Sequence, residues 1–140
     1  LDTLQAVIAN RLINDLDSIT DRRIANARLY DEAFGDLEGY ITLPPRRSNF
    51  KHVYHLYVVK AYDRDGLLEY LKCNGSGAKI HYPIPLHLQT AAHYLGYQPG
   101  DFPVCEEFCR STITLPVHQH LTDEELAHVI EQVRKFYLTQ

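Results

Sequence analysis

The sequence predicts an α/β fold of the α+β sandwich kind, in which a long N-terminal helix precedes a small, mainly antiparallel sheet covered by helices. Two observations predict it. Residues 1–35 carry apolar side chains at helical spacing, and after them short segments rich in β-branched and aromatic residues alternate with amphipathic segments. Elements in this order bury their apolar faces by packing helices against a sheet.

The first 35 residues are predicted to form one long helix. Its apolar stripe consists of Leu4, Ile8, Leu12, Ile19, Ala27, Tyr30 and Phe34. Asp2 and Gln5 resemble a capping box, and Gly35 is the predicted stop. A helix of this length measures roughly 50 Å, which is longer than the stretch of helix that one small core can cover. We therefore expect residues 1–35 to pack partly on another domain or subunit, and residues 36–140 to form the small domain.

Four segments are predicted as strands. A short edge strand is expected at Tyr40–Leu43, and the strongest strand pattern covers His52–Lys60. Further strands are expected at Ala78–Tyr82 and Thr112–Leu115, and a proline directly follows each of these two.

Helical patterns separate these strands. A short helix follows Asp63–Gly66, and its inner side carries Leu67, Leu68 and Leu71. Leu88–Leu95 and Val104–Ser111 are the next predicted helices. Thr122–Glu125 forms a capping box that opens the last helix. Its predicted inner face consists of Leu126, Val129, Ile130, Val133 and Phe136.

Composition limits the classes of protein. The net charge is −4, and the basic residues are scattered, so nucleic acid is not an expected partner. The chain has no apolar run long enough to span a membrane. Three cysteines without the spacing of a secreted scaffold suggest a reducing, cytoplasmic setting. Because the chain contains no methionine and opens directly on a helical pattern, we expect it to be a piece of a longer protein.

The densest polar and aromatic segment is Ala78–Gln89. A predicted strand ends there at His81 and Tyr82, and two prolines stiffen the chain beyond them. Both side chains donate and accept hydrogen bonds, which suits ligands rich in hydroxyl groups, such as sugars. In the alternative interpretation, His81 caps local backbone and Tyr82 packs in the core.

Other chemistries find little support. His81, His87 and His93 recur at six-residue steps, which match neither a helix face nor a strand face, and no cysteine pair has zinc-ligand spacing. No metal site is therefore predicted. The motifs of a serine nucleophile and of a phosphate-binding glycine loop are also absent.

Eight segments, in this order, closely resemble the C-terminal part of the DegT/DnrJ/EryC1/StrS sugar aminotransferases. They are Leu1–Ala6, Val53–Tyr57, Arg64–Gly66, Lys79–Gln89, Tyr94–Tyr97, Asp101–Pro103, Leu115–Pro116 and Leu121–Glu125. The resemblance covers essentially the whole chain, and its most specific part is His-Tyr-Pro-Ile-Pro-Leu-His-Leu-Gln at 81–89.

This resemblance implies the small domain of a fold-type-I aminotransferase that works as a homodimer. Such enzymes use pyridoxal phosphate to move an amino group from glutamate to a keto group of a nucleotide-linked deoxysugar. The lysine that forms the Schiff base with the cofactor lies upstream of the segment that matches Leu1. No lysine of this chain occupies its context, so the resemblance implies no catalytic residue here and an inactive isolated chain.

The resemblance carries two substrate contacts over to this chain, His81 and Tyr82. Leu86 and His87 follow in the same loop as further substrate-binding candidates. The chain departs from the family at Ser76, where an isoleucine is common, and at Lys79, where a glycine is common. A different class of function stays open: a stand-alone binding or interaction module that has this fold and no catalysis.

Overall fold

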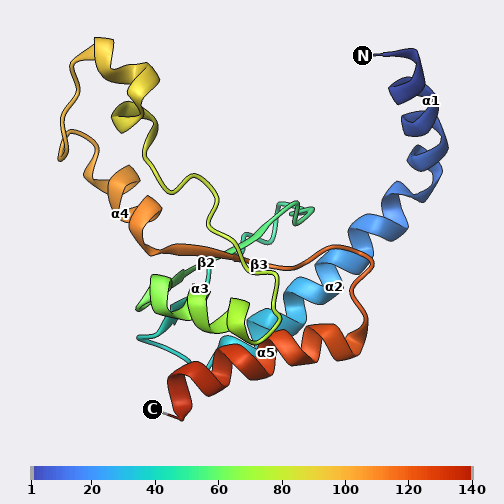
Figure 1. Ribbon diagram of the computed structural model, residues 1–140. Helices are drawn as coiled ribbons and strands as arrows, with labels where there is room; N and C mark the ends of the chain where they lie inside the picture. The colour runs from blue at the N-terminus through green and yellow to red at the C-terminus, as the bar shows by residue number, and fades with distance from the viewer. Residues whose placement is uncertain (1, 140) are drawn as a thin grey trace.

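The computed structural model describes residues 2–139 (Figure 1), so the predicted helix start at Leu1 and the domain end at Gln140 lie outside the described residues. The α-helices are α1 (Thr3–Leu12), α2 (Leu16–Phe34), α3 (Arg64–Cys73), α4 (Pro103–Ser111) and α5 (Asp123–Leu138). The strands are β1 (Ile41–Thr42), β2 (Tyr57–Ala61) and β3 (Thr112–Leu115). Three 3-10 helices complete the fold, η1 (Ile13–Asp15), η2 (Leu86–Leu88) and η3 (Thr90–Leu95).

The three strands form one antiparallel sheet in the order β1-β2-β3. Val58 pairs with Thr114 and Val59 pairs with Ile113. Because successive side chains of a strand point to opposite faces, this register sorts the sheet into two faces. The predicted fold class, helices covering a small antiparallel sheet, is confirmed.

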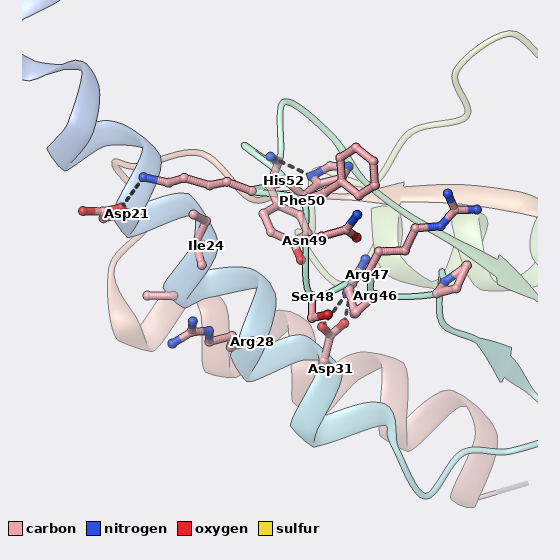
Figure 2. Close-up of a pocket in the computed structure, with 14 residues that line it drawn as sticks. Asp21, Ile24, Arg28, Asp31, Arg46, Arg47, Ser48, Asn49, Phe50 and His52 are labelled. Carbon is pink, nitrogen blue, oxygen red and sulfur yellow. Dashed lines mark hydrogen bonds and ion pairs between the residues drawn. The ribbon is translucent and has the colours of Figure 1, made fainter.

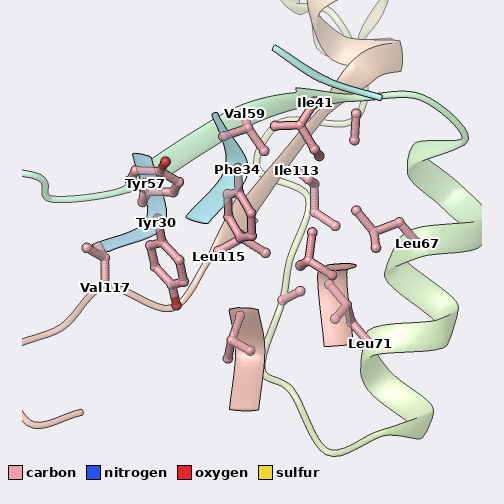
Figure 3. Close-up of a cluster of buried hydrophobic side chains, with 14 of the residues drawn as sticks. Tyr30, Phe34, Ile41, Tyr57, Val59, Leu67, Leu71, Ile113, Leu115 and Val117 are labelled. Carbon is pink, nitrogen blue, oxygen red and sulfur yellow. The ribbon is translucent and has the colours of Figure 1, made fainter. Parts of the chain in front are cut away.

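The inner face of the sheet carries the hydrophobic core. Tyr57, Val59, Ile113 and Leu115 point from β2 and β3 toward α2, α3 and α5, as Figure 3 shows for their partners Phe34 and Leu71. The predicted inner residues of α3 and α5 also lie in or against this core. The core therefore fixes β2 and β3 from one side and leaves their other face for α4.

The predicted long helix is present from Thr3 to Phe34 but is not one continuous α-helix. A turn of 3-10 helix, η1, separates α1 from α2. The predicted capping box is present, with the Asp2 backbone N–H donating to Gln5 Oε1 at 3.2 Å, and α2 ends before Gly35. Only the part of the stripe from Ala27 onward is buried, whereas Leu4, Ile8 and Leu12 are at least half exposed. Packing of this exposed part on another domain or subunit stays a prediction.

Two predicted strands are confirmed only in part. β2 begins only at Tyr57, because Tyr54 adopts a left-handed backbone with φ of 48° and its N–H donates to His52 Nδ1 at 2.9 Å. The segment 78–82 forms a single bridge, between Lys79 and Thr114, and no longer strand. The backbone leaves the sheet after Lys79, and Tyr82, with a φ of 58°, and Pro83, which has no N–H to donate, do not resume the pairing.

The remaining helices agree with the sequence, with one exception. α3, α4 and α5 form where they are predicted, and α5 has the expected capping box, with Glu125 N–H donating to Thr122 Oγ1 at 3.1 Å. The predicted helix 88–95 is instead the pair η2 and η3, interrupted at Gln89, whose ψ of 146° is extended.

Candidate functional site

A groove opens on the outer face of the sheet, opposite the hydrophobic core. Its floor comes from β2 and β3, one wall from residues 81–86, and the other wall from α4 and the residues before it. The groove has a volume of about 970 Å³, within the usual size of small-molecule sites, and apolar side chains dominate it. The floor includes Val58, Thr112 and Thr114, and the walls include His81, Tyr82, Leu86, Phe102, Cys105 and Phe108.

His81 and Tyr82 bring polar groups to this apolar groove. His81 is half-buried, and its Nδ1 lies 2.8 Å from Thr114 Oγ1 on the floor. Tyr82 is 74% exposed, and among the described residues its hydroxyl has no hydrogen-bond partner. Its left-handed backbone costs about 1–3 kcal/mol, and such strain persists only where the surroundings hold it. The structure therefore places both side chains where a ligand can reach them.

Leu86 and His87 occupy different environments. Leu86 is 73% exposed and lines the groove. His87 is buried behind the wall, where its Nε2 lies 3.1 Å from Glu106 Oε1 and its ring packs against Phe102 at 4.7 Å between centroids. Of the four residues that the resemblance singled out, three line the groove, and contact of any of the four with a substrate stays a prediction.

Glu106, which the sequence did not single out, is the buried acid of this region. Its Oε1 accepts hydrogen bonds from the N–H groups of Gly100 at 2.8 Å and Phe102 at 3.3 Å, besides its contact with His87. The Gly100 N–H, then the Phe102 N–H and His87, hold the pKa of the Glu106 carboxyl below its ordinary value of 4.5, while burial opposes them. The sequence signal was a glutamate in the first turns of a helix, close to the backbone amides that precede it.

Low pH is therefore expected to weaken the hydrogen bonds between Glu106 and the loop that contains Gly100 and Phe102. A carboxyl whose folded pKa is lowered stabilises the fold fully above its unfolded pKa, and this stabilisation is lost as the pH falls through the folded value. As the pH falls below 4.5, we expect the amides of Gly100 and Phe102 to gain hydrogen exchange relative to their intrinsic rates. Exchange measured by NMR, with the Val59 amide of β2 as control, tests this. Equal changes at all three amides would contradict it.

A second depression, of about 1080 Å³, lies between α2 and the loop of residues 45–52. Figure 2 shows how ion pairs fasten this loop to α2. Arg46 donates from Nε and Nη2 to the two Asp31 oxygens at 2.9 and 2.6 Å, and Lys51 Nζ lies 3.2 Å from Asp21. Asp31 also raises the pKa of Arg46 by this pairing. Two basic residues of this loop, Arg46 and Lys51, thus form ion pairs that attach the loop to α2.

A shallower hollow joins the two sites. It shares Arg46, Lys51 and His52 with the basic depression, and Leu56, Val58 and Phe108 with the groove. The concave surface therefore runs from a basic end beside α2 to an apolar end that carries His81 and Tyr82.

The profile of the DegT/DnrJ/EryC1/StrS aminotransferase family matches residues 1–134. The chain belongs to this family. Among curated relatives, it is 37% identical to the erythromycin biosynthesis sensory transduction protein EryC1 of Saccharopolyspora erythraea, over 96% of this chain and 36% of EryC1. It is 36% identical to the dTDP-3-amino-3,4,6-trideoxy-alpha-D-glucose transaminase of Streptomyces venezuelae, over 97% of this chain and 36% of that protein.

Solved structures of the family agree with the fold. DesV of S. venezuelae, in complex with a ketimine intermediate, matches with a TM-score of 0.92 and 34% identity over 97% of this chain and 36% of DesV. The chain thus spans about a third of the length of these relatives, in their C-terminal portion.

The structure also places other groups that aminotransferase chemistry could use. Lys51, Lys60 and Lys135 form ion pairs with Asp21, Glu107 and Glu131. Lys72 and Lys79 are exposed, and no lysine of the chain lines the groove. Within residues 2–139, no three His, Cys, Asp or Glu side chains gather closely enough to bind a metal ion. In the same range, none of the helices has the length and apolarity that crossing a membrane requires.

Proposed function

We propose that this chain is the small domain of a pyridoxal-phosphate-dependent aminotransferase, which works as a homodimer and moves an amino group from glutamate to a keto group of a nucleotide-linked deoxysugar. One observation carries the proposal: an apolar groove of suitable size has the polar tips of His81 and Tyr82 on one wall, and Thr114 of the sheet holds the His81 ring. The names of the transaminase relatives, which act on dTDP-linked amino sugars, support the substrate class.

The cofactor itself does not fit the residues of this chain. Pyridoxal phosphate supplies an electron sink and is held by a lysine, whereas no lysine lines the groove here. In the proposed enzyme, the cofactor is therefore bound by the part of the protein that this chain does not span. The contribution of this chain is to bind and orient the sugar.

The groove residues suit a neutral sugar in distinct ways. Thr114 holds the His81 ring by Nδ1, which leaves Nε2 to meet a sugar hydroxyl. The Tyr82 hydroxyl can donate or accept, and the wall at Leu86 offers an apolar surface to the less polar parts of the sugar. The basic end of the concave surface, where Arg28 and Arg47 have no ion-pair partner among the described residues, suits the diphosphate of a nucleotide sugar.

Substitutions in the groove test the proposal in the full-length enzyme. We expect His81→Ala and Tyr82→Phe each to lower kcat/KM for the keto sugar by roughly 3- to 100-fold, the range for one lost hydrogen bond with or without an unpaired partner. The half-reaction with glutamate should change by less than about twofold, because glutamate lacks the sugar contacts. Steady-state and single-turnover kinetics with nucleotide-linked keto sugars provide both numbers.

Tyr94→Phe is the matched control, since Tyr94 is 85% exposed and lies outside the groove. Normal sugar kinetics in both groove variants, or an equal loss in both half-reactions, would show that His81 and Tyr82 are structural. A full-length protein that binds sugars without transamination would instead favour a binding module.

A further inference from the structure

The two walls of the groove meet behind it at one buried carboxylate. Glu106 belongs to α4, His87 to η2, and Gly100 and Phe102 to the loop before α4. Glu106 Oε1 lies within 2.8–3.3 Å of a nitrogen of each of these three residues. Neither Glu106 nor His87 lines the groove, so this cluster acts from outside the ligand space.

Two of the partners of Glu106 connect it to residues that line the groove. Leu86 precedes His87 in η2 and lines one wall. Phe102 donates its own N–H to Glu106 and lines the opposite wall. The Phe102 ring also packs on His87 at 4.7 Å and edge-on to Tyr97 at 5.0 Å between centroids. A shift of the carboxylate would therefore move both walls.

The segment between the walls has few other anchors. It extends away from the body of the domain in Figure 1, as a yellow-to-orange arm that contains η2 and η3. Within the fully described stretch 79–105, His87 is the only buried residue. A backbone with few buried contacts opens easily unless specific hydrogen bonds hold it.

Glu106 differs from its neighbour Glu107 in its burial and in its partners. Its side chain is 8% exposed, whereas that of Glu107, the next residue of α4, is 49% exposed and pairs with Lys60 on the surface. Among the described residues, the one lysine or arginine that pairs with Glu106 is Arg110, at 3.8 Å and mostly exposed. The carboxylate is thus neutralised mainly by backbone N–H groups of the arm, whose position it fixes in return.

We propose that Glu106 is a positioning residue of the groove: through His87 and the amides of Gly100 and Phe102, it sets the distance between the two walls that hold the sugar. The proposal rests on the proposed function for the identity of the ligand. The hydrogen bonds themselves do not depend on it. A small misplacement of binding groups can cost up to about 100-fold in rate, so the effect is measurable.

The first test compares Glu106→Gln with the matched control Glu107→Gln in the full-length enzyme. We expect Glu106→Gln to raise KM for the keto sugar, lowering kcat/KM by roughly 10- to 100-fold, and to leave the glutamate half-reaction within about twofold. Glu107→Gln should leave both unchanged. Equal kinetics in the two variants, or an equal loss in both half-reactions of Glu106→Gln, would overturn the proposal.

The second test keeps the packing and removes one contact. His87→Phe retains a ring against Phe102 but cannot bond to Glu106, so it should raise the sugar KM less than Glu106→Gln does. The double variant should add little, because both changes act through the same contact. Fully additive effects would show that the two residues act separately and would overturn the coupling.

Amide exchange separates failure of this proposal from failure of the proposed function. In Glu106→Ala, which removes the acceptor oxygen that glutamine would keep, the Gly100 and Phe102 amides should exchange faster than in the wild type, while the Val59 amide stays unchanged. Unchanged exchange at Gly100 and Phe102 overturns the role of Glu106, whatever the substrate. Faster exchange in a protein that transaminates no sugar would instead leave the positioning role intact and refute the proposed function.

Discussion

Replacing Phe34 by alanine is expected to lower the free energy of unfolding by about 3–5 kcal/mol. Phe34 is 1% exposed at the end of α2, and its ring stacks on Tyr30 with 5.6 Å between centroids. The change removes a large apolar side chain from beneath β2 and β3 and leaves a cavity that the closed core cannot fill (Figure 3). Urea titration followed by circular dichroism measures the difference.

Phe50→Ala is the matched control for this substitution. Phe50 is 65% exposed in the loop after β1, so the same change of side chain removes little buried surface there. We expect its effect to stay within about 0.5 kcal/mol. Similar losses in the two variants would show that Phe34 does not stabilise the core as its burial indicates.

The parts of the fold that the sequence predicted well are those with a periodic apolar pattern. The steps between Ala27, Tyr30 and Phe34 placed the buried face of α2, and the capping box at Thr122 placed the start of α5. Such signals are local, because a helix is specified by neighbours three and four residues apart. The apolar pattern also includes Leu4 and Ile8, but these side chains are exposed. There the pattern predicted an apolar helix face that this domain does not bury.

The errors have a common cause, which is that strand propensity does not report backbone turns. His52 to Leu56 is rich in strand-forming residues, yet a left-handed Tyr54 bends the chain and buries its ring beside Tyr57. The chain likewise leaves the sheet after Lys79, before the left-handed Tyr82. A local bond to His52 and packing of the Tyr54 ring near Tyr57 and Arg46 hold the first turn, and strand propensity reports neither.

The same reasoning explains what the sequence missed at the groove. His81, Tyr82 and Leu86 lie within one short segment, so a local motif could identify them. Thr114 is 33 residues from His81, and Glu106 is 19 residues from His87. The bridge between Lys79 and Thr114 brings the first pair together, and the contacts of Gly100 and Phe102 with α4 bring the second pair together.

The largest loss of activity is expected for the 140-residue chain on its own, which should show no transaminase activity and no stoichiometric cofactor at any lysine. A lysine that holds the cofactor needs a site near the substrate and a lowered pKa. In this chain the ion pair with Glu131 instead raises the pKa of Lys135, and no lysine lines the groove. Glutamate and keto sugars with added pyridoxal phosphate provide the activity assay.

Borohydride reduction followed by peptide mass spectrometry locates any cofactor on the chain. The exposed lysines should yield only low labelling spread over several positions, since exposed amines react without selection. Lys72→Ala serves as the control, because Lys72 is exposed and does not line the groove. It should label as the wild type does at the remaining positions. One lysine labelled to completion, together with amino transfer to a sugar, would show that this domain carries its own catalytic centre and that the proposed division of labour is wrong.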